Sequence, residues 1–311
     1  MQIRIANAPT SWGVEDPEDG ANPPWRQVLD QTTAAGYAGI ELGPIGYLPE
    51  RSDVLRGELE QRRLELVAGF LFEPLHTPAG SARALEVAER TCRLLSAVGA
   101  RYLVIIQGFT RERERAAGRP GAALPLRAGE RSRLIDCVHE VARLAADEHG
   151  LVPCFHPHAG TDVEFEDEIE RLVEDTDPAL VGLCIDTGHC AYAGVDPVAL
   201  YRRHADRVVY FHLKDVDRGR LLGALARALS FEQAVAARVF CPLGQGVVDF
   251  AGLRAALVER GFEGWGTVEQ DRLPTDSATP AEHAAASLAH LRDIGLAGSQ
   301  PPAVTTRPEA G

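Results

Sequence analysis

Residues 207–215 read RVVYFHLKD, an apolar run rich in β-branched and aromatic residues that ends in His212, Lys214 and Asp215. Short runs of this composition are typical of buried strands. The polar ending stands out because Lys214 is the only lysine among 32 basic residues. Lysine carries a compact point charge and arginine a wide planar fork, so the exception indicates a site that needs an ammonium group. The alternatives are chance or a local ion pair with Asp215.

Seven other segments resemble 207–215 and alternate with amphipathic segments. They are IRIANAP (3–9), AGIELG (38–43), LELVAGFLF (64–72), RYLVIIQG (101–108), LVPCFHPH (151–158), LVGLCID (180–186) and GWGTVEQD (264–271). Between them, residues 81–99 carry apolar residues at 85, 88, 92 and 95 and end at a glycine, which predicts a helix. Eight strands alternating with helices predict an α/β fold of the (β/α)8 TIM-barrel type. A doubly wound open sheet is the rival, but no strand is followed by a GxGxxG phosphate turn.

We expect residues 1–296 to form a single barrel domain, because α/β barrels often reach this length as one domain. Segments 109–129 and 216–246 lack clear periodicity and follow the fourth and seventh expected strands. Long loops at these barrel ends commonly carry function. The Arg-rich run 111–119 inside the first of them is typical of a solvated face. The composition of residues 297–311 predicts a disordered tail.

The composition excludes several classes of protein. A net charge of −13 argues against nucleic-acid partners and anionic membranes. No apolar stretch reaches the roughly 18–20 residues of a spanning helix, and the N-terminus lacks the blocks of a signal peptide. The six cysteines show no CxxC pair or zinc-type spacing. We therefore expect a cytoplasmic protein without a disulfide framework.

Four consecutive expected strands end in imidazole and carboxylate side chains, in the sequences HPH, DTGH, HLKD and EQD. The residues concerned are His156, His158, Asp186, His189, His212, Lys214 and Glu269. In a barrel these strand ends are neighbours on one rim, so the side chains should converge. One such residue is usually structural, but four consecutive strand ends of this kind favour a divalent first-row metal with open coordination positions.

Weaker candidates for substrate contact follow other strands. They are Trp12, Glu41, Glu73 and Gln107. Glu41 could instead orient a metal ligand or belong to the barrel floor. Trp12, in the sequence SWG, could form an apolar wall for a sugar ring or be a core residue.

The motifs TDPALVGLCIDTGH (176–189), DRVVYFHLKDV (206–216), FHPHAGT (155–161) and GWGTVEQD (264–271) resemble the xylose-isomerase-like superfamily of sugar isomerases, epimerases and dehydratases. Within it, the chain most resembles the inosose (2-keto-myo-inositol) dehydratases. The resemblance is strongest over residues 151–271. It implies metal ligands at His156, Asp186, His212 and Glu269, with Asp271 as the alternative to Glu269. His156 departs from the Glu that is usual at its position in the superfamily.

The resemblance also implies a divalent cofactor, a small polyol or sugar substrate, and a homo-oligomer. Carboxylate and imidazole ligands suit Mn or Co, with Mg, Fe and Zn as alternatives. The expected enzyme is a lyase that dehydrates an inosose-like ketone through an enolate. His158 is the expected base, His189 the acid or hydroxyl anchor, and Lys214 a donor to the enolate oxygen or the departing hydroxyl. The alternatives are an epimerase or isomerase on a keto-sugar, and a barrel without catalytic activity.

Overall fold

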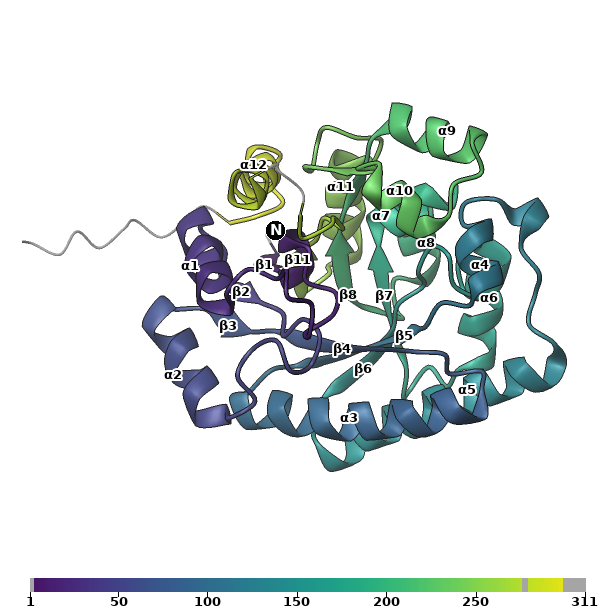
Figure 1. Ribbon diagram of the computed structural model, residues 1–311, viewed down its shortest axis with the longest axis horizontal. Helices are drawn as coiled ribbons and strands as arrows, with labels where there is room; N and C mark the ends of the chain where they lie inside the picture. Colours follow the sequence, from purple (N-terminus) through teal and green to yellow (C-terminus); the bar gives the residue numbers. More distant parts are fainter. Residues whose placement is uncertain (1–2, 276–278, 299–311) are drawn as a thin grey trace, which may run out of the picture.

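The computed structural model describes residues 3–275 and 279–298, and Figure 1 shows a ring of strands surrounded by helices. The strands are β1 (Arg4–Asn7), β2 (Gly39–Ile40), β3 (Glu65–Leu66), β4 (Ala68–Glu73), β5 (Tyr102–Gln107), β6 (Val152–Phe155), β7 (Gly182–Asp186), β8 (Val208–Leu213) and β11 (Trp265–Val268). They pair in parallel in the order β3-β2-β1-β11-β8-β7-β6-β5-β4. Only Val67 separates β3 from β4, so one continuous segment forms both ends of this order and closes the barrel.

The predicted TIM barrel is therefore confirmed, and each expected strand is present. The outer helices alternate with the strands as predicted. They are α1 (Trp25–Ala35), α2 (Ser52–Arg62), α3 (Pro78–Val98), α5 (Ala128–Arg143), α6 (Glu166–Asp175), α8 (Pro197–His204), α11 (Phe250–Arg260) and α12 (Pro280–Asp293). Helix α3 covers the expected 81–99 segment and ends at Gly99, whose φ of 90° suits a residue without a side chain.

Alternate residues of each strand point to opposite sides of the barrel wall, which creates two hydrophobic regions. On β5, Leu103 and Ile105 pack toward the helices, whereas Tyr102, Val104 and Ile106 pack inside the barrel. All six cysteines are buried as free thiols. Within the described residues, no helix is both long and apolar enough to cross a membrane.

The segment after β5 contains α4 (Arg111–Ala116) and a short 3-10 turn (Pro120–Ala122). The expectation of a solvated Arg-rich face is wrong for Arg113, which is 2% exposed. Its guanidinium donates to both carboxylate oxygens of Glu168, each at 2.7 Å, and to the carbonyl of Thr161. Arg113 therefore ties this loop to the segment that follows β6.

The segment after β8 contains the antiparallel pair β9 (Asp215–Val216) and β10 (Phe240–Cys241), with α9 (Arg218–Ala226) and α10 (Phe231–Ala236) between them. The carboxylate of Asp215 accepts hydrogen bonds from the backbone N–H groups of residues 216, 244, 246 and 248. It therefore organises this loop. The alternative of a Lys214–Asp215 ion pair is wrong, since the ion pairs of Lys214 are made with other carboxylates.

The expected tail at 297–311 lies mostly outside the described residues. Its first residue, Ala297, is buried and forms a parallel bridge with Ile3. The barrel packing therefore extends at least one residue beyond the expected boundary.

Glu164 lies buried beside Arg113, and its Oε1 accepts a hydrogen bond of 2.6 Å from the N–H of Gly118. Burial raises the pKa of Glu164 to about 7, although this hydrogen bond and Arg113 oppose the rise. An unfolded glutamate ionises near its ordinary pKa of 4.5, so the folded state holds an extra proton between that pH and 7. This contribution to stability is complete below pH 4.5 and is lost as the pH rises through 7.

Glu164→Gln should therefore match the parent in stability near pH 5 and exceed it at pH 8, by about 2 kcal/mol. Urea denaturation at several pH values measures the difference. Parallel stability curves for the two proteins between pH 5 and 8 would contradict the prediction.

Candidate active site

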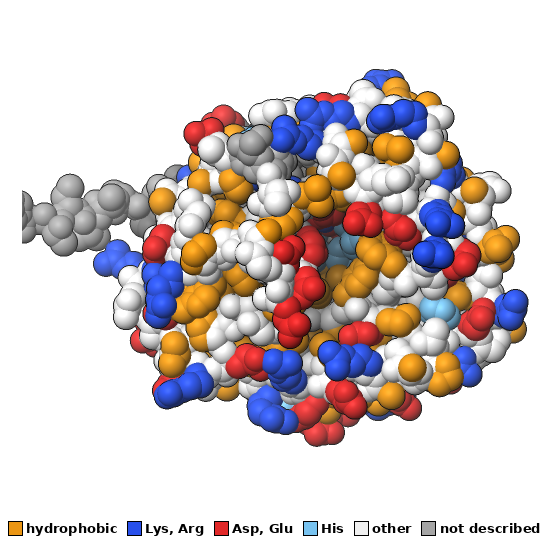
Figure 2. All heavy atoms as spheres, in the orientation of Figure 1, with side chains coloured by type: hydrophobic (Ala, Val, Ile, Leu, Met, Phe, Trp, Pro, Cys, Tyr) orange, Lys and Arg blue, Asp and Glu red, His pale blue; other side chains and the backbone are white. Residues whose placement is uncertain are grey.

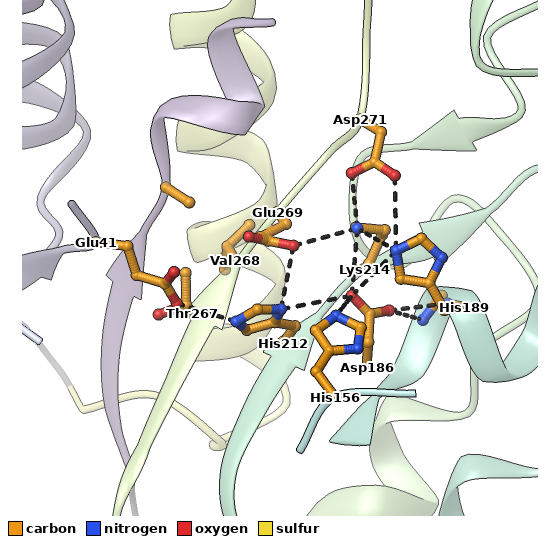
Figure 3. A network of polar contacts seen from close by, with 12 residues as sticks. Glu41, His156, Asp186, His189, His212, Lys214, Thr267, Val268, Glu269 and Asp271 are labelled. Atoms are coloured by element: carbon orange, nitrogen blue, oxygen red, sulfur yellow. Dashed lines mark hydrogen bonds and ion pairs between the residues drawn. The ribbon is translucent and has the colours of Figure 1, made fainter. Parts of the chain in front are cut away.

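The carboxyl ends of β6, β7, β8 and β11 bring together a buried set of imidazoles and carboxylates (Figure 3). Asp186 is the last residue of β7 and pairs in register with His212 of β8. Nδ1 of His212 lies 3.8 Å from Oδ2 of Asp186 and 3.3 Å from Oε2 of Glu269. Nε2 of His156 lies 3.7 Å from the same Asp186 oxygen. The structure thus places the four expected ligands together.

The local hydrogen bonds leave suitable atoms facing this cluster. Oδ1 of Asp186 accepts from the N–H groups of Gly188 and His189 and caps α7 (Thr187–Tyr192), so Oδ2 is left to face the imidazoles. Nδ1 of His156 is 2.7 Å from the carbonyl of Pro157, which leaves the Nε2 lone pair directed at Asp186. Among the described residues, Nδ1 of His212 makes no hydrogen bond. This donor set fits a divalent cation.

Lys214 lies 1% exposed at the centre of an acidic cluster. Its Nζ is 2.6 Å from Asp271, 3.1 Å from Glu269 and 3.2 Å from Asp186. Burial disfavours the charge, but the three carboxylates outweigh it and hold the pKa of Lys214 well above its ordinary value. The side chain is therefore an ammonium that several carboxylates share.

Gly188 allows this position of the lysine. A Cβ atom at residue 188 would lie 2.6 Å from Cγ of Lys214, inside any real contact distance. The glycine in the DTGH sequence thus makes room for the lysine stem.

The rings of His158 and His189 lie close together, with centroids 3.7 Å apart and planes tilted by 36°. Burial lowers the pKa of both imidazoles well below the ordinary value, and the nearby imidazoles and ammonium lower it further. Both rings are therefore neutral near pH 7. Nδ1 of His158 is 2.8 Å from the carbonyl of Ala159, so its Nε2 is a proton acceptor. Nε2 of His189 is 2.9 Å from the ammonium of Lys214.

A cavity of about 380 Å³ opens above this cluster. One wall is apolar and is formed by Phe70, Phe72, Ile106, Phe109, Phe231 and Val235. The rim carries the acidic side chains of Glu15, Asp16, Asp19 and Glu232. Figure 2 shows the hollow with red carboxylates along its edge and pale blue histidine inside. His156, His158, His212, Lys214, Glu269 and Asp271 line its floor, whereas His189 lies behind Lys214.

The four weaker candidates for substrate contact do not line this cavity. Trp12 is buried and donates its indole N–H to Gln31. Glu73 pairs with Arg83, and Gln107 bonds His76 and Asp162. Glu41 is buried beneath His212. Each of these side chains is held by a neighbour in the protein, which strand position alone did not reveal.

The sequence interpretation missed the apolar wall. Phe70 and Phe72 alternate along β4 on the same side as Ala68, which packs inside the barrel. That alternation is a signal in the sequence, because residues two apart on a strand share a face. Phe109 and Phe231 lie on the two loop segments and carry no comparable signal.

Residues 29–294 match the family model described as "Xylose isomerase-like TIM barrel". The chain belongs to the xylose isomerase-like TIM barrel family. Among curated relatives, it is 34% identical to the inosose dehydratase of Geobacillus kaustophilus over 275 residues, 88% of each chain. It is 36% identical to the rhizopine catabolism protein MocC of Rhizobium meliloti over 283 residues, which cover 89% of this chain and 84% of MocC.

Solved structures of the same fold include IolI protein with a bound zinc atom, at a TM-score of 0.71 and 16% identity, covering 94% of this chain and 98% of IolI. D-allulose 3-epimerase from Methylomonas sp. in complex with D-allulose has a TM-score of 0.69 and 17% identity, covering 94% and 97%. Several curated relatives that match most of the chain at 31–34% identity are named inosose dehydratase, so the chain is an enzyme rather than the non-catalytic barrel that the sequence left open.

Proposed function

We propose that this protein is a metal-dependent hydro-lyase that removes water from an inosose-like cyclic polyol ketone. The observation that carries the proposal is a cavity floor lined by His156, His158, His212, Lys214 and Glu269, with Asp186 directly against His156, His212 and Lys214. The curated relative named inosose dehydratase, similar along 88% of the chain, supports the same reaction. We propose Mn or Co as the metal, with Zn, Fe and Mg as alternatives.

Each residue of the site has a separate role in the proposed elimination. A divalent ion held by the four ligands would supply a Lewis acid that stabilises negative charge on the ketone oxygen. Nε2 of His158 takes the proton from the carbon beside the ketone, which gives the enolate. The Lys214 ammonium donates a proton to the hydroxyl on the next carbon as its C–O bond breaks. A C=C bond forms and water leaves, while His189 holds the ammonium in place.

The shape and charge of the cavity support a neutral ring as substrate. Six carboxylates line it, from Glu15, Asp16, Asp19, Glu232, Glu269 and Asp271, against the cations Lys214 and Arg272. This balance disfavours a phosphorylated or carboxylated substrate. The phenyl rings offer the apolar C–H face of a cyclic polyol a flat contact surface.

An epimerase is the second candidate, favoured by the fold shared with D-allulose 3-epimerase. It would use the same proton abstraction and return the proton to the opposite face. The two reactions differ in product, because dehydration of a β-hydroxy ketone creates an absorbing enone and epimerisation does not.

Ultraviolet absorbance during incubation with a panel of inososes and ketoses tests the proposal. We expect absorbance to rise with an inosose only, to be lost after treatment with a chelator, and to return with Mn or Co. Solvent hydrogen exchange without any absorbing product would favour the epimerase. A wild-type protein that cannot be loaded with a divalent metal would exclude both.

A further inference from the structure

Glu41 follows β2 directly and is fully buried inside the barrel, below the cavity floor. Its Oε1 accepts a hydrogen bond of 2.6 Å from the hydroxyl of Tyr210 and lies 3.0 Å from Nε2 of His212. Figure 3 shows the Glu41 carboxylate on one side of the His212 ring and Glu269 and Asp186 on the other. A buried carboxylate needs such partners, and here one of them is a candidate metal ligand.

The two nitrogens of His212 therefore face different groups. Oε1 of Glu41 accepts from the Tyr210 hydroxyl and acts as an acceptor toward His212 as well, so Nε2 of His212 carries the hydrogen. When the ring is neutral, as a metal ligand must be, its lone pair is therefore on Nδ1, the atom that lies 3.3 Å from Glu269 and 3.8 Å from Asp186. Only this tautomer can offer a nitrogen ligand on the side of the ring where the other ligands lie.

We propose that Glu41 is a positioning residue that fixes His212 in the tautomer and orientation whose Nδ1 binds the metal. This inference rests on the metal site of the proposed function. It assigns Glu41 neither to substrate contact nor to the metal, although Glu41, His212 and Glu269 also bring ligand atoms within 4.8 Å of one another. Glu41 contacts Nε2 of His212, whereas Asp186 faces Nδ1 of the same ring. A metal ion bound by Nδ1 and Asp186 would therefore lie on the side of the ring away from Glu41.

The surroundings hold Glu41 rigidly. Its N–H donates to the carbonyl of Asn7 at 2.9 Å. The Tyr210 hydroxyl also contacts Oγ1 of Thr267, and the Tyr210 ring stacks on Tyr102 with centroids 4.7 Å apart. Partners that orient a metal-binding histidine in this way typically change metal affinity by about 10–100-fold when they are removed.

Binding of Co²⁺, followed by visible absorption and by competition with a chelator, tests the role without any substrate. Glu41→Ala should lower the affinity by about 10–100-fold and leave the absorption bands of bound Co²⁺ unchanged, since no ligand is lost. Glu41→Gln should recover part of the affinity, because its amide oxygen can still accept from Nε2. Tyr210→Phe removes the other hydrogen bond of Oε1 and should cost less than Glu41→Ala. Glu73→Gln, a glutamate outside the cavity, is the control.

Unchanged affinity in Glu41→Ala would overturn the inference, as would equal losses in Glu41→Ala and Tyr210→Phe, which indicate a structural role. Altered Co²⁺ bands like those of Glu269→Gln would make Glu41 a ligand and also overturn it. A measurement on the wild-type protein covers the case in which the variants do not fold. In ¹⁵N-histidine spectra of the Zn²⁺-loaded protein, Nε2 of His212 should carry the hydrogen and Nδ1 the metal.

The reverse assignment of the two nitrogens would overturn the inference and leave the proposed function standing. Absence of metal binding by the wild-type protein would overturn both. The two failures are therefore distinguishable.

Discussion

Lys214→Arg is expected to lower kcat by about 10²–10³-fold while the protein still binds its metal. The lysine stem passes against Gly188, and its ammonium fits among Asp186, Glu269 and Asp271 at 2.6–3.2 Å. A guanidinium keeps the positive charge, but its planar fork is wider and gives up protons far less readily. Lys214→Arg therefore keeps the positive charge that balances the three carboxylates but weakens proton donation to the departing hydroxyl.

Turnover with an inosose and the bound metal content are the two measurements for this variant. Arg203→Lys, on the surface beside Glu166 and Glu170, makes the opposite exchange as a control and should leave turnover unchanged. Full activity in Lys214→Arg would show that only a positive charge is needed there.

The second large effect concerns the proton on the carbon beside the ketone. His158→Ala should abolish exchange of this hydrogen with solvent and lower kcat by about 10²–10⁴-fold, because Nε2 of His158 is the proposed base. His189→Ala should slow elimination but leave part of the exchange, since His189 contacts the Lys214 ammonium rather than the cavity. The ratio of exchange to elimination thus distinguishes the two histidines.

Deuterium uptake from D₂O, followed by mass spectrometry of recovered substrate, measures exchange in each variant. Metal content is the control, because His158 is adjacent in space to His156, with ring centroids 5.5 Å apart. If both variants keep their metal and exchange at the parent's rate, neither histidine carries the proton, and Lys214 would be the remaining candidate on the cavity floor.

The barrel could be predicted from the sequence because its strands are short apolar runs separated by helices of regular period. The features that the sequence did not predict depend on contacts between residues that are far apart in the chain. Arg113 belongs to a run of charges that resembles a solvated face, and its burial depends on partners distant in sequence, Thr161 and above all Glu168, 55 residues away. The strands β9 and β10 are two residues each, which is too short for any periodic signal.

The candidate site could also be predicted from the sequence only in part. Parallel strands place their carboxyl ends on one rim, so His156, Asp186, His212 and Glu269 could be grouped from their positions in the sequence. Strand position does not fix which neighbour a side chain contacts. The position of Glu41 after its strand therefore leaves substrate contact, orientation of a metal ligand and a barrel-floor role open, and only the structure places it against the far side of His212.

Part of the apolar wall of the cavity is built by two loops that contact each other, next to the strand residues Phe70, Phe72 and Ile106. The rings of Phe109 and Phe231 have centroids 5.6 Å apart, and the N–H of Glu232 donates to Glu114 of α4. In the proposed reaction, His158 and Lys214 transfer protons and follow β6 and β8, whereas the ring and substituents of the substrate would contact these loops. A change of substrate range in this scaffold therefore requires paired replacement. If one of these loops were replaced alone by that of a homologue, it would pack against a second loop that suits another ligand. Substrate specificity therefore depends on the two loops together.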